Sequence, residues 1–496
     1  MSSGARLASV LGRVPGSAWA ALGGLAWALC FADRGLLLGP WVALAPLVAL
    51  LGSKRPTWYA FVHGTAFWGA SLYWIPATVV TFGRVPWALG ILGLVLLASF
   101  ISLLFWVPFG YLGQRLWAAG RWRRYAGLPA LWVALEWLRE YILSGFPWNL
   151  AAYALVEVPG ALPLAALVGS YGLAFLVVWV NVALVGSLGE RRWRPLAAAV
   201  GVTLVGLLVG AWIRPENGVG EAARKVRVLQ PNIPNLTAWD EAQVQRNYRQ
   251  VLAQATAACE PGALLVLPES ALWPYTYERH PSLVAALDAI AEGGCWLLIN
   301  SITSAGEAYY NSTLLIGPEG IEGRYDKRHL VPFGEYVPLQ GVFTWLDKLS
   351  RLAGDFTAGA EPALMRWGDE QLAAAICYEV VYPGSVANQV RAGATMLVTV
   401  TNDAWYGDTT APWQHLRAPQ LRAAENARPM LRAAITGVSA VIAADGSITD
   451  FLGVGEKGVL AARVVGRDRL TPYSRAPWLV PLACCLVALL AYARVP

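Results

Sequence analysis

The sequence predicts a protein in two parts, a polytopic bundle of membrane-spanning α-helices and an α/β domain. Of its 496 residues, 56% are hydrophobic, only 14% are charged and 24 are tryptophan, which is too apolar for an ordinary soluble domain. Residues 1–215 are almost continuously apolar, residues 220–472 have the mixed pattern of a soluble domain, and residues 476–496 are apolar again. We therefore expect a membrane domain, a soluble domain and a C-terminal transmembrane helix.

The apolar segments predict eight transmembrane spans. A bilayer core of about 30 Å requires roughly 20 apolar residues per helix. By this measure seven spans precede the soluble part and one follows it, near residues 16–32, 35–52, 57–81, 86–114, 125–145, 162–188, 193–213 and 476–493. The first is interpreted as an uncleaved anchor rather than a signal peptide, because further spans follow it.

Basic residues predict the orientation of these spans, because lysine and arginine collect in cytoplasmic loops. One set of alternate loops holds most of them, at Arg6, Arg13, Lys54, Arg55, Arg115, Arg121, Arg123, Arg124, Arg191, Arg192 and Arg194. The other loops hold little beyond Arg34 and Arg84. This asymmetry places the N-terminus inside and the soluble domain outside. The net charge of +6 then mainly reflects topology, and no nucleic-acid partner is expected.

Short β-rich runs alternate with helical stretches in the soluble part, which predicts a layered α/β domain. Residues 240–258 have helical periodicity, with Asp240 as N-cap and Glu241 in the first turn. A second helix is expected near residues 412–428. Six runs are predicted to be strands buried on both faces, at residues 226–230, 264–268, 296–300, 312–316, 372–377 and 395–400.

Three polar residues follow predicted strands, where α/β folds place their functional groups: Glu269, Lys327 and Cys377. Each alone has an ordinary interpretation, as a surface carboxylate, a loop lysine or a small buried side chain. Together they fit one chemistry. A thiol attacks as the thiolate, and its free pKa is about 8.5, so it needs a base and a positive neighbour. The set therefore predicts acyl transfer through a thioester, with the glutamate as base and the lysine beside the oxyanion.

The motifs around these residues resemble a known family. LPES at Glu269, YDKRHLVPFGEYVP at Lys327 and ICYE at Cys377 are similar to the Glu-Lys-Cys triad motifs of the carbon-nitrogen hydrolase, or nitrilase, superfamily. With the predicted spans, the whole chain resembles the apolipoprotein N-acyltransferases. The resemblance implies a nitrilase-like αββα sandwich and gives the three residues the roles of base, oxyanion donor and nucleophile.

The resemblance also implies substrates, a location and supporting residues. The donor would be a phospholipid such as phosphatidylethanolamine, the acceptor a diacylglyceryl lipoprotein, and the site would face the periplasm from the bacterial inner membrane. Glu335 would support the lysine, and Tyr378 and Glu379 would shape the surroundings of the thiol. Trp239 would lie on a mobile arm over the acyl pocket, although packing at the start of a helix is an equally open interpretation.

Two other functions remain open from the residues, a membrane-tethered nitrilase-type amidohydrolase and a non-enzymatic sensor or transport partner. The donor ester is already activated, so no cofactor is expected. No metal is expected either, because no HExxH motif occurs and the four histidines are dispersed, at His63, His280, His329 and His415.

Two pairs of residues have open interpretations. Cys259 and Cys295 could form a disulfide in an oxidising compartment, which their positions in the sequence do not decide. Arg139 and Glu140 are costly in lipid, so they either line a headgroup route or form a structural pair.

Overall fold

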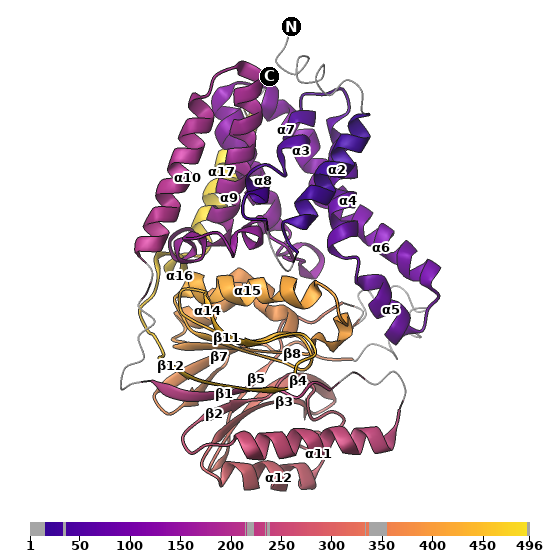
Figure 1. Cartoon of the computed structure of the whole chain (residues 1–496), viewed down its shortest axis with the longest axis vertical. Helices are drawn as coiled ribbons and strands as arrows, with labels where there is room; N and C mark the ends of the chain where they lie inside the picture. The colour runs from indigo at the N-terminus through magenta and orange to yellow at the C-terminus, as the bar shows by residue number, and fades with distance from the viewer. Residues whose placement is uncertain are drawn as a thin grey trace. The chain divides into compact units, whose positions relative to one another are not determined.

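The chain divides into two compact units, one of Met1–Arg214 with Ala476–Pro496 and the other of Pro215–Arg475. The computed structural model (Figure 1) describes residues 15–32, 36–213, 215, 223–233, 235, 239–332, 334–336 and 355–493. Of the basic residues used to predict orientation, Arg6, Arg13 and Arg34 lie outside this part of the chain.

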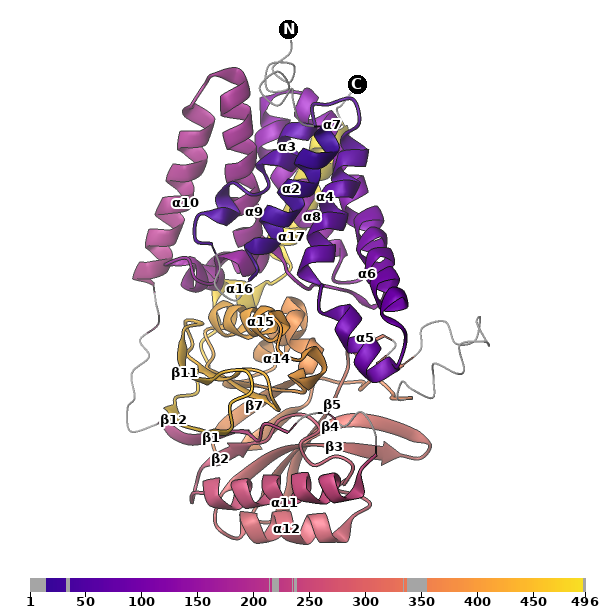
Figure 2. The same ribbon diagram turned by 45° about the vertical axis from the view of Figure 1, so that its right-hand side comes forward.

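The first unit consists of helices, with α9 and α10 running side by side (Figure 2). A π-helical segment, Ser102–Trp106, joins α6 to α7. Three helices in the described residues are long and apolar enough to cross a membrane, Trp87–Ala118, Ala161–Glu190 and Arg194–Trp212; the full set of eight spans stays a prediction. The labelled helices are α2 Gly16–Leu29, α3 Ala45–Leu50, α4 Pro56–Ser71, α5 Ile75–Gly83, α6 Trp87–Ile101, α7 Val107–Ala118, α8 Leu128–Leu138, α9 Ala161–Glu190, α10 Arg194–Trp212 and α17 Leu479–Ala493.

Small residues let helices of this unit approach closely, as is common between helices in membranes. At Gly24 of α2, an added Cβ would lie 2.2 Å from the carbonyl oxygen of His63 in α4. Glycine is therefore required at this crossing. Helix α9 departs from helical geometry at Gly169, where φ is 66° and ψ is 179°, values that favour glycine.

Arg139 and Glu140, the two charged residues predicted within a span, are both buried and have protein partners. The Arg139 guanidinium donates to the carbonyl oxygens of Phe146 (3.0 Å) and Trp148 (2.7 Å). The Glu140 carboxylate accepts from the Tyr171 hydroxyl at 2.7 Å. These contacts favour a structural role for both residues, because bonded polar groups lose much of the cost of their burial.

The second unit contains two six-stranded sheets with orders β12-β1-β2-β3-β4-β5 and β11-β10-β9-β8-β7-β6. Strands β1, β2 and β3 are parallel, as are β7, β8 and β9. All six predicted strands are present, as β1, β2, β3, β4, β7 and β8. The strands are β1 Arg224–Gln230, β2 Leu264–Val266, β3 Trp296–Ala305, β4 Ala308–Gly317, β5 Gly320–Asp326, β6 Leu364–Trp367, β7 Glu370–Ile376, β8 Met396–Thr401, β9 Met430–Ala434, β10 Ser439–Ile442, β11 Ile448–Leu452 and β12 Gly458–Val464.

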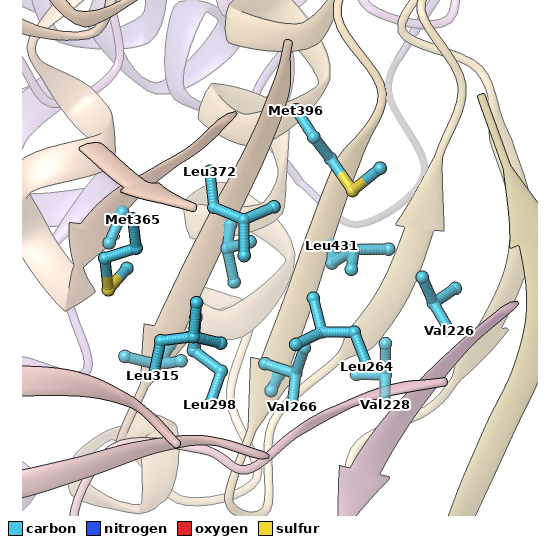
Figure 3. Packing of buried hydrophobic residues seen from close by; sticks show 14 of the residues in the cluster. Val226, Val228, Leu264, Val266, Leu298, Leu315, Met365, Leu372, Met396 and Leu431 are labelled. Atoms are coloured by element: carbon cyan, nitrogen blue, oxygen red, sulfur yellow. The ribbon is translucent and has the colours of Figure 1, made fainter. Parts of the chain in front are cut away.

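The two sheets pack face to face through aliphatic side chains, as Figure 3 shows. Side chains that are fully buried in this way contribute about 1.5–3 kcal/mol each. One sheet supplies Val226, Val228, Leu264, Val266, Leu298 and Leu315, and the other supplies Met365, Leu372, Met396 and Leu431. The runs predicted to be buried on both faces therefore form the centre of the domain.

Helices cover the outer faces of the two sheets, which gives the layers helix, sheet, sheet, helix (Figure 1). Helices α11 Glu241–Ala258 and α12 Pro281–Ala291 pack on the first sheet through a second apolar cluster that includes Val251 and Leu287. Helices α14 Pro383–Arg391 and α15 Ala411–Asn426 lie on the second sheet, and a short helix, α16 Pro472–Arg475, follows β12. Both predicted helices are confirmed, as α11 and α15.

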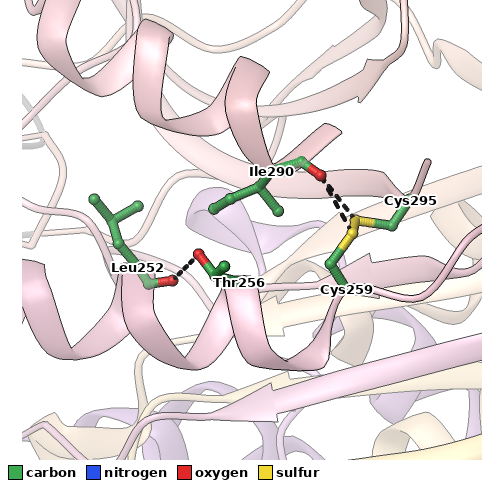
Figure 4. Close-up of a disulfide and its surroundings, with 5 residues drawn as sticks. All are labelled: Leu252, Thr256, Cys259, Ile290 and Cys295. Atoms are coloured by element: carbon green, nitrogen blue, oxygen red, sulfur yellow. Dashed lines mark hydrogen bonds between the residues drawn. A yellow bond between two sulfur atoms is a disulfide. The ribbon is translucent and has the colours of Figure 1, made fainter. Parts of the chain in front are cut away.

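Both ends of α11 are fixed by specific contacts. At its start the Asp240 side chain accepts a hydrogen bond from the Gln243 backbone N–H at 3.2 Å, as the N-cap prediction requires. At its end Cys259 forms a disulfide with Cys295, which directly precedes β3, with a Cα–Cα distance of 5.5 Å (Figure 4). The pairing left open by the sequence is therefore present.

Candidate active site

Three strand ends bring Glu269, Lys327 and Cys377 together in the second unit. Lys327 directly follows β5 and Cys377 directly follows β7, while Glu269 lies in the loop after β2. The Lys327 ammonium Nζ is 3.7 Å from Glu269 Oε1, and the charges of both residues act on the Cys377 thiol. All three side chains are buried. The folded domain thus assembles a thiol, a carboxylate and an ammonium group in one enclosed place.

Cys377 has an unusual backbone conformation. Its φ is +52°, in the left-handed region that non-glycine residues seldom adopt and that costs of the order of 1–3 kcal/mol. The residue opens a short 3-10 turn, Cys377–Val381, at the end of β7. This sharp change of direction places the thiol Sγ 3.3 Å from the hydroxyl of Thr401, the last residue of β8.

Glu379 joins this turn to the loop that carries Lys327. Its carboxylate Oε2 accepts from the backbone N–H of Ile376, the last residue of β7, at 2.8 Å. Its other oxygen accepts from the backbone N–H groups of Arg328 (2.6 Å) and His329 (3.1 Å). One buried carboxylate therefore fixes two of the three strand ends relative to each other.

Lys327 lies between two carboxylates. Its Nζ is 2.8 Å from Glu335 Oε1 as well as 3.7 Å from Glu269 Oε1. Burial alone would lower the pKa of Lys327, but the charges of Glu335 and Glu269 outweigh burial and raise it. The side chain therefore stays a cation in the working pH range, and it can face the negative oxygen of a tetrahedral intermediate.

Asn311 and a backbone amide orient the carboxylates. The Asn311 side-chain NH₂ donates to Glu269 Oε1 (3.0 Å) and to Glu335 Oε1 (2.9 Å). The Asn300 side-chain NH₂, on β3, donates to the side-chain oxygen Oδ1 of Asn311 (2.7 Å), which leaves the Asn311 NH₂ group facing the carboxylates. The Asn402 backbone N–H donates to the other oxygen of Glu269 (2.9 Å). Asn300 and Asn311 were not predicted as site residues, because nothing in the β3 and β4 runs distinguishes a site residue from a strand residue.

The charges around the thiol determine its resting state. Burial and the negative charge of Glu269 raise the pKa of Cys377, and Lys327 only partly opposes them. The resting group is therefore a protonated thiol beside a carboxylate. This arrangement suits proton transfer from sulfur to Glu269 during attack on a carbonyl carbon.

Tyr378 and Trp239 lie in different surroundings. Tyr378 is buried beside Cys377 and meets Tyr382 edge-on, with ring centroids 5.4 Å apart. Trp239 lies just before α11, is 61% exposed, and meets Trp273 edge-on at 5.9 Å. Trp273 follows Glu269 in the β2 loop and is also exposed. Trp239 therefore belongs to an exposed aromatic pair, not to a packed helix start.

No group of three or more His, Cys, Asp or Glu side chains that could hold a metal ion is found where the chain is described.

Residues 225–471 match the carbon-nitrogen hydrolase family model, so the layered α/β domain is a carbon-nitrogen hydrolase domain. An amidase of the nitrilase superfamily from Nesterenkonia AN1 aligns with a TM-score of 0.39 and 22% identity, over 50% of this chain and 94% of that one. Nit3 of Saccharomyces cerevisiae aligns with a TM-score of 0.38 and 17% identity, over 52% and 94%.

Comparisons over the whole chain identify the family. Residues 23–183 match the model of the apolipoprotein N-acyltransferase N-terminal domain. The apolipoprotein N-acyltransferase of Geobacter metallireducens is 33% identical, over 96% of this chain and 95% of that protein. That of Caulobacter vibrioides is 34% identical, over 97% and 94%. The chain belongs to the apolipoprotein N-acyltransferase family.

Proposed function

We propose that the protein transfers a fatty acyl chain from a phospholipid to the N-terminal α-amino group of diacylglyceryl-cysteine apolipoproteins, through a thioester on Cys377. The observation that carries this proposal is the buried set of thiol, carboxylate and ammonium at three strand ends. The names of the relatives support the lipoprotein acceptor. Phosphatidylethanolamine is the proposed donor, and an activated ester needs no cofactor.

In the first half-reaction, Cys377 Sγ attacks the ester carbonyl carbon of the phospholipid while Glu269 takes the thiol proton. The carbonyl oxygen becomes an oxyanion, which the Lys327 ammonium stabilises. When the tetrahedral intermediate collapses, the carbon–oxygen ester bond breaks and Glu269 returns the proton to the leaving alkoxide. The products are a lysophospholipid and the acyl thioester.

In the second half-reaction, the neutral α-amine of the lipoprotein attacks the thioester carbonyl carbon. Glu269 accepts a proton from the nitrogen, the carbon–sulfur bond breaks, and the thiolate takes that proton from Glu269. An amide is more stable than a thioester, so this step runs towards the acylated lipoprotein. The cycle is ping-pong, as nucleophilic catalysis with two substrates requires.

Supporting roles follow from the contacts of each side chain. Glu335 holds the Lys327 ammonium at 2.8 Å, and Glu379 holds the nucleophile turn and the lysine loop together. Tyr378 forms part of the wall beside the thiol, and the resemblance to the family gives the exposed Trp239 the role of covering the acyl chain of the donor.

We further propose a membrane domain of residues 1–215 with seven spans, a catalytic domain of residues 220–472 and a C-terminal span within residues 476–496. The loop arginines favour an N-terminus on the inside, so after seven crossings the catalytic domain would lie on the periplasmic side of the inner membrane. The disulfide between Cys259 and Cys295 supports this side, because disulfides persist in oxidising compartments and are rare in the cytosol.

A membrane-tethered amidohydrolase is the alternative, and the fate of the acyl chain separates the two functions. Purified protein in detergent receives phosphatidylethanolamine and a diacylglyceryl-cysteine peptide, and mass spectrometry measures peptide amide and free fatty acid. Transfer predicts that most of the consumed acyl chain appears as peptide amide, and that Cys377→Ala forms none. Free fatty acid without acylated peptide would indicate the hydrolase instead.

A further inference from the structure

Four buried polar side chains close to Cys377 have no part in the steps proposed above. Thr401 ends β8, Asp403 follows it, His415 lies on α15 and Arg432 lies on β9. None is more than 1% exposed. We call these four residues the Asp403 network. Polar groups buried this deeply are costly unless every one is hydrogen-bonded, so their contacts require an explanation.

The contacts join the four residues into a continuous chain that ends at the nucleophile. The Arg432 Nη2 is 2.6 Å from Asp403 Oδ2 and 3.2 Å from His415 Nδ1. The Thr401 hydroxyl is 2.8 Å from Asp403 Oδ1 and 3.3 Å from Cys377 Sγ. At the far end, His415 Nε2 is 3.2 Å from the Cys377 carbonyl oxygen. The network therefore reaches Cys377 at two points, its sulfur and its backbone.

The contact with the Cys377 carbonyl decides which nitrogen of His415 carries the proton. Burial and the charge of Arg432 lower the pKa of His415, so its imidazole is neutral. A carbonyl oxygen can only accept, so a hydrogen bond to the Cys377 carbonyl places the His415 proton on Nε2. Nδ1 then accepts from Arg432 at 3.2 Å, and it also lies 3.1 Å from Asp403 Oδ1. Burial alone would raise the pKa of Asp403, but the charge of Arg432 and the hydrogen bond from Thr401 oppose burial, and the pKa is lowered. The network is then an ion pair with no net charge, and Asp403 raises the pKa of the thiol less than burial and Glu269 do.

The surrounding backbone holds the ion pair in place. The Arg432 Nε donates to the Val438 carbonyl oxygen at 2.9 Å. At Gly437, an added Cβ would lie 2.4 Å from Asp403 Oδ2, so the backbone passes directly over the carboxylate. A carboxylate enclosed in this way cannot move away from Thr401 without a shift of the backbone. The network is therefore suited to hold the Thr401 hydroxyl and the Cys377 carbonyl oxygen in fixed positions.

Two consequences follow for the nucleophile. The bond from His415 to the Cys377 carbonyl helps to hold the left-handed backbone of that residue, which is otherwise unfavourable. In the resting state the Thr401 hydroxyl donates to Asp403. Once Glu269 has taken the thiol proton, rotation about the Cβ–Oγ1 bond lets the same hydroxyl donate to the thiolate at 3.3 Å.

We propose that Thr401 is a catalytic residue that donates a hydrogen bond to the Cys377 thiolate, and that Asp403, His415 and Arg432 are positioning residues for the nucleophile. This inference rests on the proposed function, in which Cys377 carries the acyl chain. The titratable groups that act on the thiol, besides Asp403, are Glu269, Lys327 and the buried Tyr406.

The matched variants Thr401→Val and Thr401→Ser test the hydroxyl. Two rates are measured in the full-length protein, thioester formation with phosphatidylethanolamine and alkylation of Cys377 by iodoacetamide between pH 6 and 10. A hydrogen bond to a charged group corresponds to roughly 10- to 100-fold in rate. The valine variant is expected to form the thioester more slowly by about this factor, and its alkylation profile should move to higher pH. The serine variant should keep both properties of the native protein.

Three results would overturn the inference. One is a valine variant with native thioester formation. Another is a slow valine variant with an unshifted alkylation profile, which would indicate a packing role for the threonine. The third is a serine variant as slow as the valine variant.

A second pair, His415→Gln and His415→Leu, tests the positioning role, because glutamine retains an N–H donor for the Cys377 carbonyl. At equal melting temperature, the glutamine variant should acylate the thiol faster than the leucine variant, and equal rates would contradict the role of His415. Cys377→Ala separates this inference from the proposed function. If that variant still acylated peptide, the proposed function would fail, and the inference with it. If it were inactive while Thr401→Val was normal, only the inference would fail.

Discussion

Replacing Glu269 with glutamine is expected to change two reactions of Cys377 in opposite directions. Thioester formation should slow, because the proton acceptor for the thiol is lost. Alkylation by a small neutral reagent should accelerate, because the charge of Glu269 is one of the causes that raise the pKa of the thiol. Loss of that charge increases the thiolate population, and alkylation consumes the thiolate directly.

The magnitudes follow from the contacts of Glu269. Loss of a general base costs about 10²- to 10⁴-fold in rate, so thioester formation should fall by at least ~10²-fold. Removing one negative charge near a buried thiol should lower the pKa of Cys377, and we expect alkylation at pH 8 to be faster by on the order of tenfold. Asn311 and the Asn402 N–H both donate to Glu269. A glutamine can accept from only one of them through its single oxygen, so the variant should also be about 1–3 kcal/mol less stable.

Both rates can be followed on one preparation. Thioester formation is measured by intact mass with phosphatidylethanolamine, and alkylation by peptide mass spectrometry after timed exposure to iodoacetamide. Glu278→Gln is a matched control, because Glu278 is an exposed carboxylate hydrogen-bonded to Ser304. It should leave both rates unchanged. If Glu269→Gln slowed alkylation in parallel with acylation, the electrostatic explanation of the raised thiol pKa would be wrong.

Three further outcomes are expected. Lys327→Met should slow thioester formation by ~10²-fold or more, because the oxyanion loses its cation; a folded variant with a near-native rate by intact mass would exclude that role. Because burial and Glu269 raise the pKa of Cys377, its thiolate population should still be rising above pH 8.5, and the iodoacetamide rate should climb through pH 9 to 10 without a plateau; a plateau near the free-thiol value would show an unperturbed thiol. A reporter active only outside the cytoplasm should work when fused after Gly218 and fail after Arg124, and the reverse pattern would place the site in the cytoplasm.

The strands that could be predicted from the sequence are those with uninterrupted apolar runs. The run at β2, LLVLP, lies between two layers and is apolar on both faces, so its burial is visible in the sequence. By contrast, β5 is GIEGRYD and β11 is ITDFL, edge strands with several exposed positions whose polar residues conceal them. Strand β9 contains the buried Arg432, which interrupts its apolar run. Helix α14 begins with Pro383 and Gly384, a pair that is typical of a turn, so this helix is not indicated by the sequence.

The candidate site could be predicted where the residue type alone suggests the chemistry. It could not be predicted where a contact depends on the pairing register of two strands. Glu269, Lys327 and Cys377 each follow a strand, and their residue types suggest nucleophilic catalysis without knowledge of the fold. Asn311 reaches the carboxylates only because β4 pairs with β3 in a register that places it near Asn300. The Asp403 network combines residues from two strands of the second sheet, β8 and β9, and from helix α15. Its histidine, His415, is far from Cys377 in sequence. Such contacts become visible only when the sheets are assembled.

The most direct test is the mass of the protein after incubation with phosphatidylethanolamine alone. The thioester mechanism predicts a gain of one acyl chain at Cys377, removal of the chain by neutral hydroxylamine, and its transfer to a diacylglyceryl-cysteine peptide as an amide. Cys377→Ala should gain no mass. The opposite result, an adduct of equal yield in the alanine variant or peptide acylation without any adduct at Cys377, would contradict a cysteine-bound acyl intermediate.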